Sequence, residues 1–531
     1  MKFSLTVQGR ERLHREIYFY GIALLVFSMP ISLFGTSLSQ FIIAGNWIAE
    51  GNLKKKMNVL FRNKAILIFL VLFAVHIIWL INTTDFAYAL KDIKIKLPLF
   101  ILPLVLSTSL PLERKRVLGI IYFFSGGIII SSLIGVGVWM GLSGTAISDH
   151  REISVYISHI RLSLMTNTVI ILLYLILERK EWIFSSKERI IILIVIFWLS
   201  AFLFILRSQT GLVVFCILIG FFIARYLLKS GKLVFKVAIL LSIAATVLYF
   251  IFTFNRAYCD FNSSYETYPL DNVTANGRPY YHNSQQLRYE NGYAVWNYYC
   301  EEELMREWNK KSSLDFKGKD LKGNQLSHTI TRYITSKGLR KDSIGISLLS
   351  ESDIKAIENG IPNHIYLNNF SLYSFFYKQL WMVDSYIKGD NPSGHSVTQR
   401  IEYLKGALFI ICNNYWFGTG TGDVQASFDN YYKLNDTRLD DRWQLRTHNQ
   451  FVTFFLSFGL IGFTLCILAI FAPVIIEKRY SDLCFILPFA ICILSFFDED
   501  TLETQAGVTF FAFTYVFFLI NGNKKPRKSE V

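Results

Sequence analysis

The chain has 531 residues, of which 52% are hydrophobic and 16% aromatic, and its formal net charge is +14. Apolar runs of about 18 residues or more recur along it, which excludes an ordinary soluble protein. The positive charge does not indicate a nucleic-acid partner. The long polar stretch from Phe254 to Thr447 holds as many acidic as basic residues, so the whole excess lies among the apolar segments. Basic residues there are typical of the cytoplasmic side of a membrane protein and of contact with anionic lipids.

Apolar runs in lipid must be helical, because every backbone N–H and C=O needs an internal partner. We therefore predict an all-α integral membrane protein with about twelve transmembrane helices and a large, mainly helical extracytoplasmic loop. The predicted spans lie near residues 17–34, 36–50, 65–82, 92–110, 117–140, 162–177, 190–206, 210–228, 234–253, 449–471, 481–497 and 505–521. The chain then divides into membrane helices (1–253), the outer loop (254–448), and the last three helices with a basic tail (449–531).

The charges of the short connections predict which side each one occupies. Alternation places most of them on one side, including Lys2, Arg10, Arg12, Arg15, Lys54, Lys55, Lys56, Arg114, Lys115, Arg116, Arg179, Lys180, Lys478, Arg479 and the tail residues Lys524, Lys525, Arg527 and Lys528. The other side carries few basic residues, namely Lys91, Lys94, Lys96, Arg151, Arg161 and Arg207. This bias predicts that both termini are cytoplasmic and that the large loop is outside.

Cysteines in the loop give only a weak indication of its chemistry. Cys259 and Cys300 could form a disulfide in an oxidising compartment, but the sequence does not establish it. The loop's histidines are scattered without metal-ligand spacing, so we predict no metal site.

The end of the loop has a more specific pattern. Apolar residues recur at helical spacing from Val397 to Asn413, with Arg400 at the start of this amphipathic helix, and the glycine-rich run Gly418–Asp423 breaks it. Thr447, followed three residues later by Gln450, forms a capping-box pattern. It predicts that Thr447 is the N-cap of the next span and that His448 is its first helical residue.

That position would suit His448 to proton transfer. The positive end of the helix dipole and nearby arginines disfavour the imidazolium form, so we expect its pKa to be lowered. A neutral imidazole can accept a proton as a general base. The alternative is a helix-end residue that forms only local hydrogen bonds.

These motifs resemble the O-antigen ligase/polymerase superfamily. The stretch Val397–Tyr403 around Arg400, the turn Trp416–Asp423, and His448-Asn449-Gln450 with Phe458–Gly462 follow the order of that family's motifs, an arginine before an amphipathic helix, a glycine-rich turn and an "HNxxL…xGxxG" helix start. Upstream, Ser158–Arg161 and Leu206–Gly211 look similar, although the family's usual Ser-Arg-Thr/Gly reads Ser208-Gln209-Thr210 here. Either Arg207 or Arg161 therefore fills the role of that arginine.

The resemblance implies both the reaction and the residues that perform it. It implies transfer of a glycan from an undecaprenyl-diphosphate carrier to lipid A-core, a growing glycan or a protein, at the outer face of the bacterial inner membrane, without cofactor, metal or nucleotide. It assigns catalytic roles to His448, Arg400 and Arg207, and substrate binding to Arg161, Asn449, Gly420, Gly422 and Asp423. Relative to shorter members, residues 255–391 are an insertion, and 397–448 carry the motifs.

Several alternatives stay open on the sequence. The glycine run could be only a tight turn, and Asp423 a solvated acid or a group that orients His448. Asp498, Glu499, Asp500 and Glu503 are expected in a solvated loop, although they could bind a cation or sugar hydroxyls. The competing functions are an O-antigen polymerase, a protein O-oligosaccharyltransferase, and a flippase or transporter of lipid-linked glycans.

Overall fold

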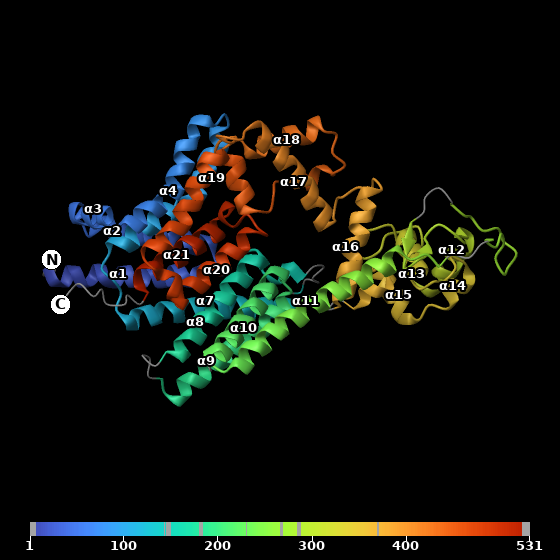
Figure 1. Ribbon diagram of the computed structural model, residues 1–531, viewed down its shortest axis with the longest axis horizontal. Helices are drawn as coiled ribbons and strands as arrows, with labels where there is room; N and C mark the ends of the chain where they lie inside the picture. The colour runs from blue at the N-terminus through green and yellow to red at the C-terminus, as the bar shows by residue number, and fades with distance from the viewer. Residues whose placement is uncertain are drawn as a thin grey trace. The chain divides into compact units, whose positions relative to one another are not determined.

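The computed structural model describes residues 7–142, 144, 150–179, 184–229, 231–265, 269–283, 288–368 and 371–522. It divides into two compact units, one of residues 1–223 with 400–531 and one of residues 224–399 (Figure 1). The basic residues Lys2, Lys180, Lys524, Lys525, Arg527 and Lys528 lie outside the described residues.

The first unit is built from helices only. In its N-terminal part these are α1 (Val7–Ser28), α2 (Leu33–Ala49), α3 (Leu53–Arg62), α4 (Lys64–Ile78), η1 (Trp79–Asn82), α5 (Phe86–Lys96), α6 (Pro98–Thr108), α7 (Arg114–Trp139), η2 (His150–Ile153), α8 (His159–Glu178), α9 (Ser186–Leu206) and most of α10 (Gln209–Lys229). Its C-terminal part holds most of α17 (Ser396–Asn413), then α18 (Val424–Leu434), η4 (Asp441–Trp443), α19 (Gln450–Ile476), η5 (Arg479–Ser481), α20 (Leu483–Phe496), η6 (Thr501–Glu503) and α21 (Gln505–Asn521).

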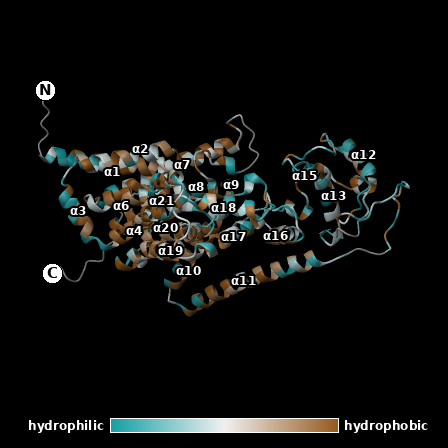
Figure 2. Ribbon diagram, turned by 90° about the horizontal axis from the view of Figure 1, so that it is seen from above, coloured by the Kyte–Doolittle hydropathy of each residue, from teal (hydrophilic) through white to brown (hydrophobic). Residues whose placement is uncertain are grey.

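Helices far apart in sequence pack together in this unit. α19 lies against α4, α21 against α6, α20 against α21 and α8, and α1 against α2 and α7. One continuous apolar core joins them, with Phe69 stacked on Tyr515 at 4.5 Å between ring centroids. Their predominantly hydrophobic ribbons are evident in Figure 2. Both ends of the sequence are therefore needed to complete the membrane part.

Seven helices of the described chain are long and apolar enough to cross a membrane: Lys64–Asn82, Arg114–Trp139, His159–Glu178, Ser186–Leu206, Gln209–Lys229, Leu233–Asn262 and Gln450–Ile476. They coincide with seven of the predicted spans, and α20 and α21 are shorter apolar helices at two more. An all-α, multi-pass membrane protein is thus confirmed, whereas a count of twelve is not. The predicted span at 92–110 is wrong as one helix, because it is divided at Leu97 into α5 and α6, where Pro98 has no N–H with which to continue α5.

Two ion pairs each join helix ends that the predicted alternation places on the same side of the membrane. Arg179 lies 3.2 Å from Asp482, and Arg116 lies 2.6 Å from Glu16, all residues of connections predicted to be cytoplasmic. Connections predicted on the outer side supply the site described below. Which end faces the cytoplasm stays a prediction.

The second unit contains α11 (Leu233–Asn262), α12 (Glu301–Lys311), α13 (Leu326–Ser336), α14 (Ser343–Ser347), α15 (Glu351–Glu358), η3 (His364–Leu367) and α16 (Leu372–Ile387). Its two short strands, β1 (Tyr289–Glu290) and β2 (Tyr293–Ala294), pair antiparallel, with Tyr289 opposite Ala294. Trp308, Tyr333 and Ile357 belong to its own buried core. Cys259 and Cys300 are both free thiols, so the disulfide that the sequence left open is not formed.

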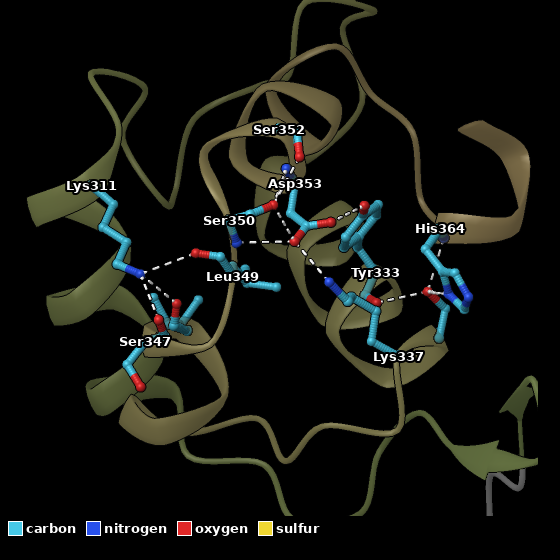
Figure 3. Close-up of polar contacts among 11 residues, drawn as sticks. Lys311, Tyr333, Lys337, Ser347, Leu349, Ser350, Ser352, Asp353 and His364 are labelled. Atoms are coloured by element: carbon cyan, nitrogen blue, oxygen red, sulfur yellow. Dashed lines mark hydrogen bonds and ion pairs between the residues drawn. The ribbon is translucent and has the colours of Figure 1, made fainter. Parts of the chain in front are cut away.

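Polar contacts reinforce that core (Figure 3). The Asp353 carboxylate accepts hydrogen bonds from the Tyr333 hydroxyl at 2.6 Å, from Lys337 Nζ at 2.7 Å, and from both the backbone N–H and the hydroxyl of Ser350. Lys311 Nζ donates to three backbone carbonyls, those of residues 346, 347 and 349. Donors that are matched in this way stabilise a carboxylate in a mostly buried position.

Candidate functional site

The start of α19 differs from the prediction, and His448 lies before the helix instead of in its first turn. The N-cap is Asn449, which has an extended backbone and whose side-chain oxygen accepts the N–H of Val452, so Thr447 is not the cap. Gln450 does not close a capping box, since its side-chain oxygen instead accepts the N–H of Leu502 at 2.7 Å. His448 therefore precedes the helix. Asparagine at the cap satisfies one orphan N–H, which explains why the helix begins later than predicted.

His448 is partly buried and unpaired. Its ring lies 5.8 Å from that of Tyr403, centroid to centroid, and neither ring nitrogen forms a hydrogen bond with any residue in the described part of the chain. The alternative of a purely local hydrogen bond is thus wrong for the described residues. Burial, followed by the charge of Arg400, lowers the pKa of His448, while Asp498 opposes the shift. The predicted direction is confirmed, and the imidazole is neutral near pH 7.

Arg400 is held beside His448 by an acidic loop, which we define as residues 497–503. The Arg400 guanidinium pairs with the Asp498 carboxylate at 2.7 Å, and Asp498 also accepts the Thr210 hydroxyl at 2.5 Å. Asn449 donates its side-chain N–H to the carbonyl of Phe497 at 3.1 Å. The loop thus ties α17, α10 and the start of α19 together, although Arg400 itself remains half exposed.

The acidic loop is not the solvated loop expected from the sequence. Glu499 lies 3.9 Å from Arg161, Asp500 accepts the Thr453 hydroxyl at 2.9 Å, and Glu503 lies 3.1 Å from Lys96. Side chains of Glu499 and Glu503 are only 19% and 10% exposed, which is what contradicts the expectation. Opposite charges packed around the loop allow this burial.

Lys96 is the clearest departure from the predicted topology. It was expected in a short outer connection, yet its side chain is 2% exposed and pairs with both Asp92, at 2.5 Å, and Glu503. Arg446 lies 3.9 Å from the same Glu503. Lys96 and Arg446 thus share one glutamate, whose other carboxylate oxygen lies 3.4 Å from the side-chain nitrogen of Gln450 at the start of α19.

The carboxylates of the acidic loop titrate differently from one another. Burial, followed by the charge of Glu503, raises the pKa of Asp500 to about 7. Burial also raises the pKa of Glu499, with Arg161 opposing it. Burial acts in the same direction on Glu503, but Lys96 and Arg446 outweigh it and lower its pKa to about 2. Glu503 is thus a permanent anion, whereas Asp500 can exchange a proton near neutral pH.

Arg161 and Arg207 are placed very differently. Arg161 lies two residues into α8, is 14% exposed, and is close enough to contribute to the lowered pKa of His448. Its Nε is buried without a hydrogen-bond partner among the described residues. Arg207 caps α9 in the left-handed conformation at φ 51°, is exposed, and forms no ion pair with the described residues. The geometry favours Arg161 for the role that the sequence left open between them.

The glycine run packs into a break in α19. Gly459 departs from helical geometry at φ 60° and ψ −168°, and the freed carbonyls of Leu456 and Ser457 accept the N–H groups of Thr419 and Gly420 at 2.8 and 2.9 Å. A Cβ on Gly418 would lie 2.5 Å from the backbone nitrogen of Gly459. Only glycine permits this approach. It lets the backbone of the glycine run bond the carbonyl groups that the break in α19 leaves without helical partners.

Gly420, Gly422 and Asp423 continue this packing. Both glycines press against the backbone of residues 82–85. The Asp423 carboxylate accepts the N–H groups of Thr84 and Asp85 at 2.7 and 2.8 Å, so it is neither solvated nor paired with His448. Their role in substrate binding stays a prediction, and their observed contacts hold the end of α4 against the site.

Sequence reasoning found His448, Arg400 and Arg161 but missed Lys96, Arg446 and the part played by the acidic loop. The only signal was the position of Arg446, two residues before His448. Within the described ranges, no group of three or more His, Cys, Asp or Glu side chains could hold a metal ion.

Comparison with known proteins supports the family resemblance. Residues 360–467 match the model of a family described as O-antigen ligase, which confirms the resemblance that the motifs indicated. The matched range contains Arg400, the glycine run and His448, and it begins inside the predicted insertion. No curated protein matches the chain. The protein is thus a multi-pass helical membrane protein that carries a segment similar to the O-antigen ligase family.

Proposed function

We propose that the protein transfers a glycan from a polyprenyl-diphosphate carrier to an acceptor hydroxyl at the outer side of the bacterial inner membrane. The observation that carries this proposal is the unpaired, neutral imidazole of His448 beside the guanidinium groups of Arg400 and Arg161. Such a site offers a base for a hydroxyl and cations for an anionic leaving group.

The reaction needs no covalent intermediate with the protein. His448 takes the proton of the acceptor hydroxyl while the acceptor oxygen forms a bond to the anomeric carbon. The bond from that carbon to the diphosphate oxygen breaks, and the lipid diphosphate leaves with the electron pair. Direct displacement of this kind inverts the anomeric centre.

The arginines act on the leaving group. Planar guanidinium groups bind phosphate oxygens in pairs, which suits Arg400 and Arg161 to the diphosphate. In the structure both arginines face carboxylates, Asp498 and Glu499, which hold them in place until an anionic donor competes for them.

The acceptor separates the related functions. A ligase would use lipid A-core, a polymerase a second lipid-linked glycan, and an oligosaccharyltransferase a protein hydroxyl. The family described by the matching model favours the first. A flippase of lipid-linked glycans would require no base, so His448 favours an enzyme over that transporter.

The test is glycan transfer by the purified protein in nanodiscs. A short-chain oligosaccharide on undecaprenyl diphosphate is supplied with each of the three acceptors, and products are identified by mass spectrometry. We expect His448→Ala to reduce kcat/KM by about 10²–10⁴-fold. His328→Ala, an exposed histidine of the other unit, is the matched control and should change it little.

The pH profile adds a readout specific to the base. Since only neutral His448 is active and its pKa is lowered, kcat/KM should rise with pH and reach half its maximum below pH 6.5. Transfer by His448→Ala within threefold of the wild type, or translocation of the donor without any transfer, would refute the proposal.

A further inference from the structure

α11 is longer than a membrane span requires. Its 30 residues rise ~45 Å, compared with a hydrocarbon thickness of ~30 Å. Lys232 and Lys236 lie at its start, and the next charged residue along it is Arg256. Nineteen residues, 237–255, separate Lys236 from Arg256, which is about the length of one span. The last turns of α11, from about residue 256, therefore project beyond the hydrocarbon.

The apolar part of α11 faces lipid within its own unit. Leu248, Phe252 and Phe254 are 64%, 66% and 42% exposed. Thr253 and Ala257 are instead buried, on the side where α16 packs. Side chains that are this exposed and apolar along a spanning helix are normal only against acyl chains.

α16 contacts α11 on both sides of the predicted boundary. The ring of Phe376 lies 5.4 Å from that of Phe254 and 6.2 Å from that of Phe250. At 1.5 Å per residue, Phe250 lies ~9 Å deeper than Arg256. Phe376 is therefore held at the level of the hydrocarbon and not above it.

Polar contacts hold an adjacent part of the same face of α16 at the headgroup level. The Tyr373 hydroxyl donates to the Asp260 carboxylate at 2.7 Å, and the Arg256 guanidinium lies 5.4 Å from the Tyr373 ring centroid. Phe375 is next to Phe376, at 5.7 Å between rings, and is 47% exposed. The helix thus places Phe376 at the level of the hydrocarbon and the contact of Tyr373 with Arg256 and Asp260 at the level of the headgroups.

From this arrangement we infer that α16 lies in the outer interface of the bilayer and anchors the unit of residues 224–399 to lipid. Phe375 and Phe376 enter the acyl region, while Tyr373 and Arg256 remain among the headgroups. Aromatic residues are favoured at this interface, and an amphipathic helix with its apolar face in the acyl boundary binds it stably. The occupant of the exposed Phe375 face is phospholipid, because Phe375 is next to Phe376, which packs against the spanning part of α11.

The anchor is tested by photocrosslinking in the full-length protein. p-Benzoylphenylalanine replaces Phe375, Phe252 or Leu348 in separate preparations, which are reconstituted in phosphatidylethanolamine–phosphatidylglycerol nanodiscs and irradiated. Position 252 reports the spanning part of α11, and Leu348, 60% exposed in the same unit, is the control for a position away from lipid. We expect phospholipid adducts at positions 252 and 375, at similar yield, and at least tenfold fewer at 348.

A second readout does not depend on crosslinking chemistry. With the exposed Cys216, Cys259 and Cys412 replaced by serine, an environment-sensitive fluorophore on Phe375→Cys should be quenched by nitroxides on lipid chains, unlike one on Leu348→Cys. Adducts at 252 but none at 375 would overturn the inference. So would crosslinks from position 375 to another part of the protein or to a second copy, or equal quenching at 375 and 348.

Discussion

Two mostly buried aspartates show how differently this chain treats a carboxylate. Asp353, in the second unit, accepts hydrogen bonds from Tyr333, Lys337 and Ser350, and although burial opposes it, these donors hold its pKa well below the usual range. Asp500, in the acidic loop, has one described donor, Thr453, and a pKa raised to about 7.

The contrast separates structural from functional burial of charge. Where donors match the carboxylate, its charge contributes to the fold. Where like charges gather, as with Asp500 beside Glu503, ionisation is disfavoured and the charge destabilises the fold. Substitutions at the two places should therefore have opposite effects on stability.

The largest effect is expected for Asp353→Ala. It leaves Lys337 and the Tyr333 hydroxyl without their partner, so the unit of residues 224–399 should lose about 3 kcal/mol. Hydrogen exchange of amides in 326–336 measures this loss. Glu351→Ala, an exposed acid of the same helix, should change the exchange by less than about 0.5 kcal/mol. Equal effects of the two variants would mean that the network in Figure 3 does not stabilise the unit.

Arg161 and Arg207 provide a similar contrast between a mostly buried and an exposed cation. Because Arg161 is beside the acidic loop and Arg207 is exposed, Arg161→Ala should reduce kcat/KM for glycan transfer by about 10–100-fold, and Arg207→Ala by less than threefold. The measurement is the nanodisc transfer assay at matched protein levels. A larger loss for Arg207→Ala than for Arg161→Ala would mean that Arg207, not Arg161, fills the role of the family's upstream arginine.

The smallest effect is expected for Asp500→Asn. Its folded pKa of about 7 exceeds the ordinary value of 3.8, so its stabilising contribution is present at low pH and is lost as the pH rises towards 7. The variant should therefore melt about 2 °C above the wild type at pH 8 and by a smaller margin at pH 5, where the folded Asp500 is protonated but its unfolded form is still ionised.

Glu503→Gln is the matched comparison for Asp500→Asn. The pKa of Glu503 is lowered to about 2, so its stabilising contribution is present above about pH 4.5 and is lost only as the pH falls towards 2. That variant should therefore melt below the wild type at both pH values. A lower melting temperature for Asp500→Asn at pH 8 would remove the distinction between the two kinds of carboxylate.

Hydropathy predicted the class of this protein because a long apolar run can satisfy its backbone hydrogen bonds in lipid only as a helix. Seven spans follow directly from it, from Lys64–Asn82 to Gln450–Ile476. It failed at 92–110, where composition did not reveal that the chain would break before Pro98 and bury Lys96. One ion-pair partner of Lys96, Asp92, is four residues away on the same helix, but the other, Glu503, comes more than 400 residues later, and no local pattern contains that information.

By itself the sequence determined the helical membrane class, the family resemblance, and the candidates His448, Arg400 and Arg161, because periodicity and motif spacing are local properties. Only the tertiary structure decided that Asn449 and not Thr447 caps α19, that Arg161 is close enough to lower the pKa of His448, and that the glycine run fills a break at Gly459. It also brought the acidic loop against these cations. The physical reason is that charge pairing and backbone satisfaction depend on partners supplied by distant segments, which meet only when the helices pack.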